Sequence, residues 1–215
     1  MIAMLDALFL QVRSIPFFYR FTLFLRILLA AGFVPTGWVK LMGRRFSQVS
    51  VETPIGAFFE AMYQTGGYWQ FIGASQILAG LLLLSPVTAH LGALLFLPII
   101  VNIFVVTVAL GFTGTWLVTG LMLVAVVYLC CWDYPRWRSL VTESAMPANF
   151  SPVRHRLEPL EASGFWVFGL CLVACFLATR GGVPMAWVPA LAVVGLGGGL
   201  FALVRFITHG RHQPA

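Results

Sequence analysis

Long apolar runs, separated by short polar breaks, dominate the chain. A helix needs about 20 mostly apolar residues to cross the hydrocarbon core of a bilayer, and charged residues or prolines mark where such runs end. Six runs reach or approach that length. They predict transmembrane helices at residues 17–41, 68–84, 88–110, 115–132, 162–179 and 183–204.

This pattern predicts an all-α integral membrane helical bundle. The first four spans make up one membrane domain at residues 17–140, and the last two make a C-terminal transmembrane hairpin at 162–207. The stretch between them, residues 141–161, is polar and contains Pro152 and Pro159. Because proline opposes helix continuation, this stretch is expected to be a polar cytoplasmic linker.

The two ends of the chain carry weaker signals. In residues 1–16 four apolar side chains fall on one helical face, which favours an N-terminal interfacial segment: Leu5, Leu8, Phe9 and Val12. A frayed terminus is the alternative. Residues 208–215 are expected to be a short tail.

The connection between the first two spans predicts a short amphipathic helix at about 54–65. Thr53 and Pro54 are typical of a helix start, and Gly66 with Gly67 is typical of a stop. The apolar residues between them repeat at helical spacing: Ile55, Phe58, Phe59, Met62 and Tyr63. A helix of this length cannot span the bilayer, so we expect it on the outer membrane face. It could be a lid over a cavity or only a packing element.

Composition and charge support the same conclusion. The chain has 215 residues, of which 60% are apolar and only 9% are charged, whereas a soluble domain has roughly 25% charged residues. With six spans, nine basic residues lie on the side of the two termini and four lie on the other. This asymmetry predicts cytoplasmic termini, and the net charge of +6 is a topology signal, not a nucleic-acid footprint.

Two basic residues in the first span are candidates for function, because a charge at bilayer depth is costly. Arg26 either extends its guanidinium to the interface or forms an inward ion pair with Asp133, at the end of the fourth span. Lys40 either anchors the helix at the outer interface beside Trp38 or pairs with Glu60 of the short helix.

Two amides in the next spans are further candidates. Gln76 shares a helical face with Gly73 and Gly80, so it either bonds across a close helix contact or contacts a ligand. Asn102 lies four residues after Pro98 and either repairs the backbone there or faces a polar cavity. Together the polar residues predict a small ligand pocket within the first four helices, lined by Arg26, Lys40, Gln76, Asn102 and Asp133.

The chain offers no recognisable set of residues for catalysis or for an intrinsic redox centre. The four cysteines have neither metal-ligand nor haem-attachment spacing, and His90 is the single histidine near a span. No nucleophile–base pair or phosphate-binding loop can be assembled from the sequence. We therefore expect no metal site and no catalytic residue, and an enzyme acting alone is the least favoured class.

Three segments resemble the DoxX family of bacterial membrane proteins. They are RILLAAGFVPTGWVKLMG at 26–43, GGYWQFIGASQILAGLLLL at 66–84 and LCCWDYPRW at 129–137. The resemblance covers roughly residues 20–140 and includes Arg26, Lys40, Gln76 and the ending that contains Asp133. It implies a multi-pass protein of the bacterial inner membrane. The founding members resemble small subunits of a thiosulfate:quinone oxidoreductase, and others are linked to thiol and oxidative-stress homeostasis through partner proteins.

Three functions follow as hypotheses. The leading one is a non-catalytic membrane subunit that supports quinone-linked redox or thiol chemistry of a partner oxidoreductase, with no intrinsic cofactor and a bound quinone in the four-helix pocket. The second is a protein that binds or transports a lipid-like ligand. The third is a structural subunit of a larger membrane complex, or an oligomer, that uses the GxxxG pair Gly195 and Gly199 for close helix contact.

Overall fold

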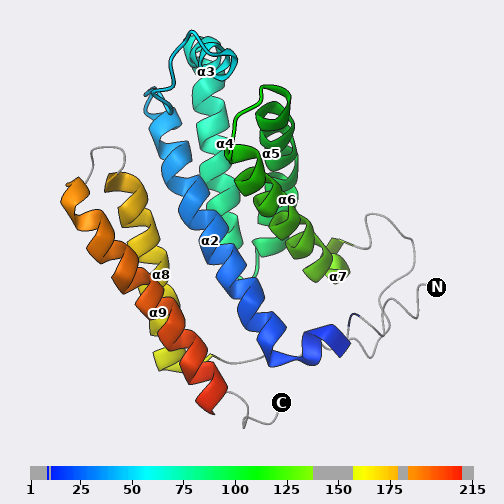
Figure 1. The fold of residues 1–215 in the computed structure, drawn as a ribbon. Helices are drawn as coiled ribbons and strands as arrows, with labels where there is room; N and C mark the ends of the chain where they lie inside the picture. Colours follow the sequence, from blue (N-terminus) through cyan, green and yellow to red (C-terminus); the bar gives the residue numbers. More distant parts are fainter. Residues whose placement is uncertain (1–8, 10, 138–156, 179–183, 210–215) are drawn as a thin grey trace. The chain divides into compact units, whose positions relative to one another are not determined.

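The computed structural model describes residues 9, 11–137, 157–178 and 184–209. Within these ranges every regular element is a helix, and six helices are long and apolar enough to cross a membrane. This confirms the predicted all-α membrane fold with six spans. The long helices are α2 (Pro16–Leu41), α4 (Gly67–Leu84), α5 (Ala89–Ala109), α6 (Thr115–Trp132), α8 (Pro159–Ala178) and α9 (Val188–His209) (Figure 1).

The first four spans begin and end within one residue of their predicted bounds. The fifth differs, since α8 begins at Pro159, three residues before the predicted start at 162. Proline fits the first turn of a helix, where its missing N–H has no helical partner to lose. The amide of Ala162 already donates to the carbonyl of Glu158. Residues 159–161 therefore belong to the span and not to the linker, and the rest of the linker up to 156 lies outside the described residues.

The shorter helices include α3 (Pro54–Gln64), α7 (Tyr134–Trp137) and the 3₁₀ helix η2 (Met185–Trp187). The helix predicted at 54–65 is confirmed, and its start has the expected chemistry. The Thr53 hydroxyl accepts a hydrogen bond from the amide of Gly56, and Pro54 is the first helical residue. Of the predicted interfacial segment at 1–16, residues 1–8 and 10 lie outside the described part, as do residues 210–215 of the tail.

The chain divides into two compact units. The central unit is Leu29–Trp137, and the terminal unit combines Met1–Leu28 with Arg138–Ala215. The boundary between them falls inside α2. The second half of α2 thus belongs with α3 to α7, and its first half belongs with α8 and α9.

Glycines let α2 and α4 approach closely in the central unit. A Cβ atom on Gly73 would lie 2.5 Å from the carbonyl oxygen of Gly37, and one on Gly37 would lie 2.6 Å from the carbonyl oxygen of Gly73. Helices in lipid associate through such small-residue contacts, because lipid tails compete with ordinary apolar packing. Further along, the rings of Phe33 and Phe96 stack with centroids 3.7 Å apart and join α2 to α5.

In the terminal unit, glycines likewise let α8 and α9 approach closely. A Cβ atom on Gly164 would lie 2.6 Å from the carbonyl oxygen of Gly198, and one on Gly195 would lie 2.9 Å from Cβ of Cys171. Gly195 of the GxxxG pair therefore packs inside the hairpin. A Cβ atom on Gly199, the other member, would meet the Phe168 ring at 3.5 Å, which is ordinary contact. Formation of an oligomer through this pair stays a prediction.

The close approach of α2 and α4 can be tested with two alanine substitutions. We predict that Gly73→Ala lowers the free energy of unfolding by about 1–3 kcal/mol, because the new methyl group meets backbone atoms that cannot move aside. Gly32→Ala in α2 is the matched control, since a Cβ there has no atom within 4 Å. Thermal unfolding in detergent measures both. Equal stability of the two variants would contradict the packing described.

Candidate functional site

Lys40 and Gln76 form a buried polar pair in the central unit. Lys40 lies in the last turn of α2, and Gln76 lies in the middle of α4. The Lys40 Nζ donates a hydrogen bond to Oε1 of Gln76 at 2.9 Å, and both residues are buried. The glycines at the α2–α4 contact bring the two backbones close enough for this bond. The structure thus brings together two of the five predicted pocket residues.

Aromatic rings surround the Lys40 ammonium. Its Nζ lies 4.2 Å from the centroid of the Phe46 ring and 5.4 Å from that of Trp69. The Trp69 indole is fixed in turn, because its Nε1 donates to the carbonyl of Arg44 at 3.0 Å. Cation–π attraction and an amide dipole therefore stabilise a charge that has lost most of its water.

The α3 helix is held over this end of the central unit by an ion pair (Figure 1). Arg45 donates from Nε and Nη2 to the two carboxylate oxygens of Glu60, both at 2.8 Å. The Arg45 guanidinium also lies 4.7 Å from the Tyr63 ring centroid. Between these residues, Phe46 and Trp69 is a cavity of about 20 Å³, which is room for one water molecule.

The sequence suggested Lys40 as a possible partner of Glu60, and the structure shows Glu60 paired with Arg45. Glu60 accepts from Arg45, which is exposed in the connection that leads to α3, whereas Lys40 is buried and donates to Gln76. Hydrogen bonds from Arg45 lower the pKa of Glu60, and the same contacts raise the pKa of Arg45. Both groups are fully charged at neutral pH.

The other three predicted pocket residues lie on α5, at the end of α6 and in the first half of α2. Asn102 is exposed on the surface of α5, and its contribution to a ligand pocket stays a prediction. Asp133 is buried at the C-terminal cap of α6, where its backbone N–H donates to the carbonyl of Leu129. Arg26 is half-buried in the first half of α2. The ion pair between Arg26 and Asp133 stays a prediction.

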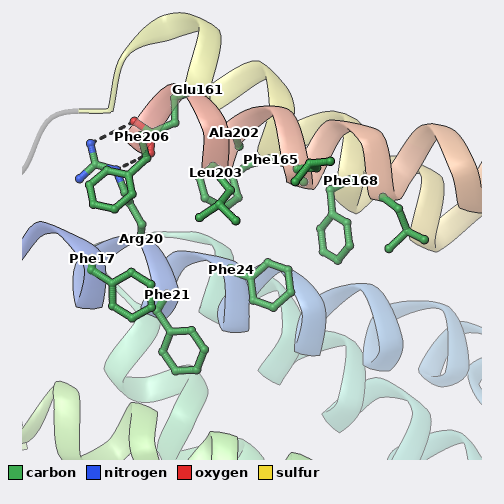
Figure 2. A pocket seen from close by; sticks show the side chains of 13 residues that line it. Phe17, Arg20, Phe21, Phe24, Glu161, Phe165, Phe168, Ala202, Leu203 and Phe206 are labelled. Atoms are coloured by element: carbon green, nitrogen blue, oxygen red, sulfur yellow. Dashed lines mark hydrogen bonds and ion pairs between the residues drawn. The ribbon is translucent and has the colours of Figure 1, made fainter. Parts of the chain in front are cut away.

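Sequence reasoning missed a second buried charge pair, Arg20 with Glu161 in the terminal unit (Figure 2). The guanidinium forms a fork: Nε donates to Oε1, and Nη2 donates to Oε2 at 3.0 Å. Its Cζ also lies 4.3 Å from the Phe206 ring centroid. The pair was missed because Glu161 was placed in the linker. Pro159 as a first-turn residue was the signal that could have placed it in a helix.

Comparison with known proteins adds a relative. No family model matches the chain, and no solved structure matches it. The six apolar helices define a multi-pass membrane protein. The chain is 36% identical over 110 residues to YwoB of Bacillus subtilis (strain 168), an uncharacterized protein, and the match covers 48% of this chain and 71% of YwoB. The chain therefore belongs to the same family as YwoB.

The ion pair on α3 predicts a pH dependence. A carboxylate whose pKa is lower in the folded state stabilises that state above its unfolded pKa of about 4.3, and the contribution is lost as the pH falls through the folded value. We predict that the amides of α3 lose protection from hydrogen exchange under acid conditions, after correction for the intrinsic pH dependence of exchange.

Two variants separate the ion pair from other effects of acid. Glu60→Gln is expected to reduce α3 protection at neutral pH and to flatten the acid response. Glu52→Gln, which changes an exposed carboxylate just before α3, is expected to behave like the unmodified protein. A Glu60→Gln profile identical to that of the unmodified protein would contradict the role given to this pair.

Proposed function

We propose that the protein is a non-catalytic, DoxX-type membrane subunit that holds a quinone-like ligand at Lys40 and Gln76 for a partner oxidoreductase. The observation that carries this proposal is the buried Lys40 ammonium between an amide oxygen and two aromatic rings. The proposal places the protein in a bacterial inner membrane, with both termini in the cytoplasm.

The chemistry around Lys40 suits a neutral, flat molecule with carbonyl groups. A lysine ammonium has three N–H donors, and a quinone carbonyl accepts such a bond well in a site shielded from water. The Phe46 and Trp69 rings offer faces against which a flat ring stacks. The residues already present thus supply both a polar contact and an apolar one.

The class of function is supported by the residues that resemble the DoxX family, Lys40 and Gln76 among them. Within the described residues there is no group of three or more His, Cys, Asp and Glu side chains that could hold a metal ion. The proposed role is accordingly to bind and position a carrier. Electron transfer itself is assigned to the partner oxidoreductase.

Lipid binding or transport at the same place is the second candidate, and the α3 helix is the observation that favours it. This helix packs against Phe46 and Trp69, the rings that contact Lys40, and it is held by a surface ion pair, Arg45 with Glu60, that contributes little energy in water. Because this ion pair contributes little energy, moving α3 away would require little free energy. The helix would act as a gate for a lipid-like molecule that enters from the membrane.

Ligand extraction tests the leading proposal. The protein is purified from a quinone-containing bacterial membrane in mild detergent, and the extracted quinone is measured by liquid chromatography. We expect about one quinone per chain. Lys40→Met should lower this by roughly ten- to a hundredfold, the equivalent of one charge-assisted hydrogen bond.

Arg44→Gln is the matched control, because this neighbouring cation is exposed and contacts Trp69 only through its backbone carbonyl. It should keep the quinone. Purified protein with neither quinone nor a co-purifying oxidoreductase would contradict the proposal. A defined lipid in place of quinone, lost in Lys40→Met, would favour the second candidate.

A further inference from the structure

Asn102 is a polar side chain on the outer side of α5. This helix packs against α4 and α6, and its buried face contains Gly92, Phe96 and Ile100. Asn102 lies on the opposite face and is exposed, as is Val105 one turn further along the helix. The amide therefore points away from the helices that α5 packs against, toward the surroundings of the central unit.

The position of Asn102 along α5 places its amide in hydrocarbon. The helix has 21 residues and is apolar enough to cross a membrane. Asn102 lies seven residues before the last one, Ala109, and seven residues of helix rise by roughly 10 Å. An asparagine side chain is too short to reach the headgroups from that depth, whereas a lysine or arginine stem can do so. The surroundings of this amide are therefore lipid chains, which offer no hydrogen bond.

Within the described residues, no hydrogen bond includes the Asn102 side chain. Other polar side chains of the spans in the central unit are paired with each other: Lys40 with Gln76, and Thr107 with Thr119. An asparagine amide has two N–H donors and a carbonyl acceptor. Leaving these groups unsatisfied in hydrocarbon is costly, so a partner from outside the central unit is favoured.

The chemistry and the depth of the amide select a second copy of the same chain as that partner. A copy in the same membrane and the same orientation has its own Asn102 at the same depth. One amide is complementary to another, because each donates from Nδ2 and accepts at Oδ1. Around a two-fold axis along the membrane normal, the two hydrogen bonds form together. A phospholipid acyl chain has no donor or acceptor at this depth, so it cannot satisfy the amide.

The residues around Asn102 let another helix come close. Pro98 and Val105, one turn away on either side, and Ala109, two turns away, are exposed and have short side chains. Short side chains let helix backbones approach each other in lipid. The helix contains no Asp, Glu, Lys or Arg, so two copies of it carry no such charges to repel each other. We call these four residues the Asn102 face: Pro98, Asn102, Val105 and Ala109.

We propose that the protein forms a homodimer in the membrane through the Asn102 face of α5, with the two Asn102 amides hydrogen-bonded to each other. The interface uses residues of the central unit alone. It is separate from the glycine pair Gly195 and Gly199 on α9, and it does not rest on the ligand proposed at Lys40.

Dimer formation is measured in lipid vesicles by single-molecule photobleaching of the full-length protein with one fluorophore per chain. Asn102→Leu should raise the dissociation constant of the dimer by about tenfold or more, because leucine offers no hydrogen bond. Asn102→Gln keeps an amide and should dimerise more tightly than Asn102→Leu. Val124→Leu is the matched control, since Val124 is 67% exposed on α6 and apolar, and it should dimerise like the unmodified protein. A monomeric unmodified protein, or an Asn102→Leu variant that dimerises equally well, would overturn the proposal.

Disulfide cross-linking locates the interface without removing the amide. It uses full-length protein whose four cysteines are replaced by alanine. A disulfide requires Cα atoms within about 7 Å, which identical residues reach only near a two-fold axis. Val105→Cys should therefore form a linked dimer under mild oxidation, whereas Val124→Cys should not. Cross-linking at Val124→Cys that equals or exceeds that at Val105→Cys would overturn the assignment to the Asn102 face.

Quinone extraction from the same samples separates the dimer from the site proposed at Lys40. Asn102→Leu should keep any quinone that the unmodified protein holds, and Lys40→Met should keep the dimer. Loss of quinone in Asn102→Leu, with the dimer unchanged, would assign the amide to a ligand and would overturn this proposal.

Discussion

Hydrocarbon offers no hydrogen-bond partner, and this constraint organises the described structure. A polar side chain at depth is costly unless it has a partner within the protein. Arg20 meets Glu161, Lys40 meets Gln76, and the hydroxyls of Thr107 and Thr119 lie 3.0 Å apart between α5 and α6. Each contact joins two different helices. The few polar residues of an apolar chain therefore fix which helices touch and where, while the glycines set how closely they approach.

The fold could be predicted from the sequence because the patterns that indicate each helix are local. The length of each apolar run gave the spans, and Thr53 with Pro54 gave the start of α3. The contact between Gln76 and another helix could be predicted for the same reason, because Gly73 lies on the same face of α4 and predicts a close helix neighbour. These inferences need only helical periodicity and the cost of burying a polar group. They hold without knowledge of which helices are neighbours.

The candidate site was less predictable, because its partners are distant in the chain or share no periodic signal. Arg20 and Glu161 are 141 residues apart, and nothing near either residue indicates the other. The sequence did not predict that Asn102 is exposed, because α5 is apolar on all sides and its lipid-facing side cannot be distinguished from its buried side. In a soluble helix, the polar face would have made that distinction.

The buried pair of Arg20 and Glu161 gives the most direct test of the central claim that polar groups at depth are held by each other. A double-mutant cycle with Arg20→Met, Glu161→Met and the double variant is measured by unfolding in detergent. Each single substitution should cost about 3–5 kcal/mol, because it leaves one charge buried alone, and the double variant should recover much of that loss. Single variants as stable as the unmodified protein, or costs that simply add, would contradict the account.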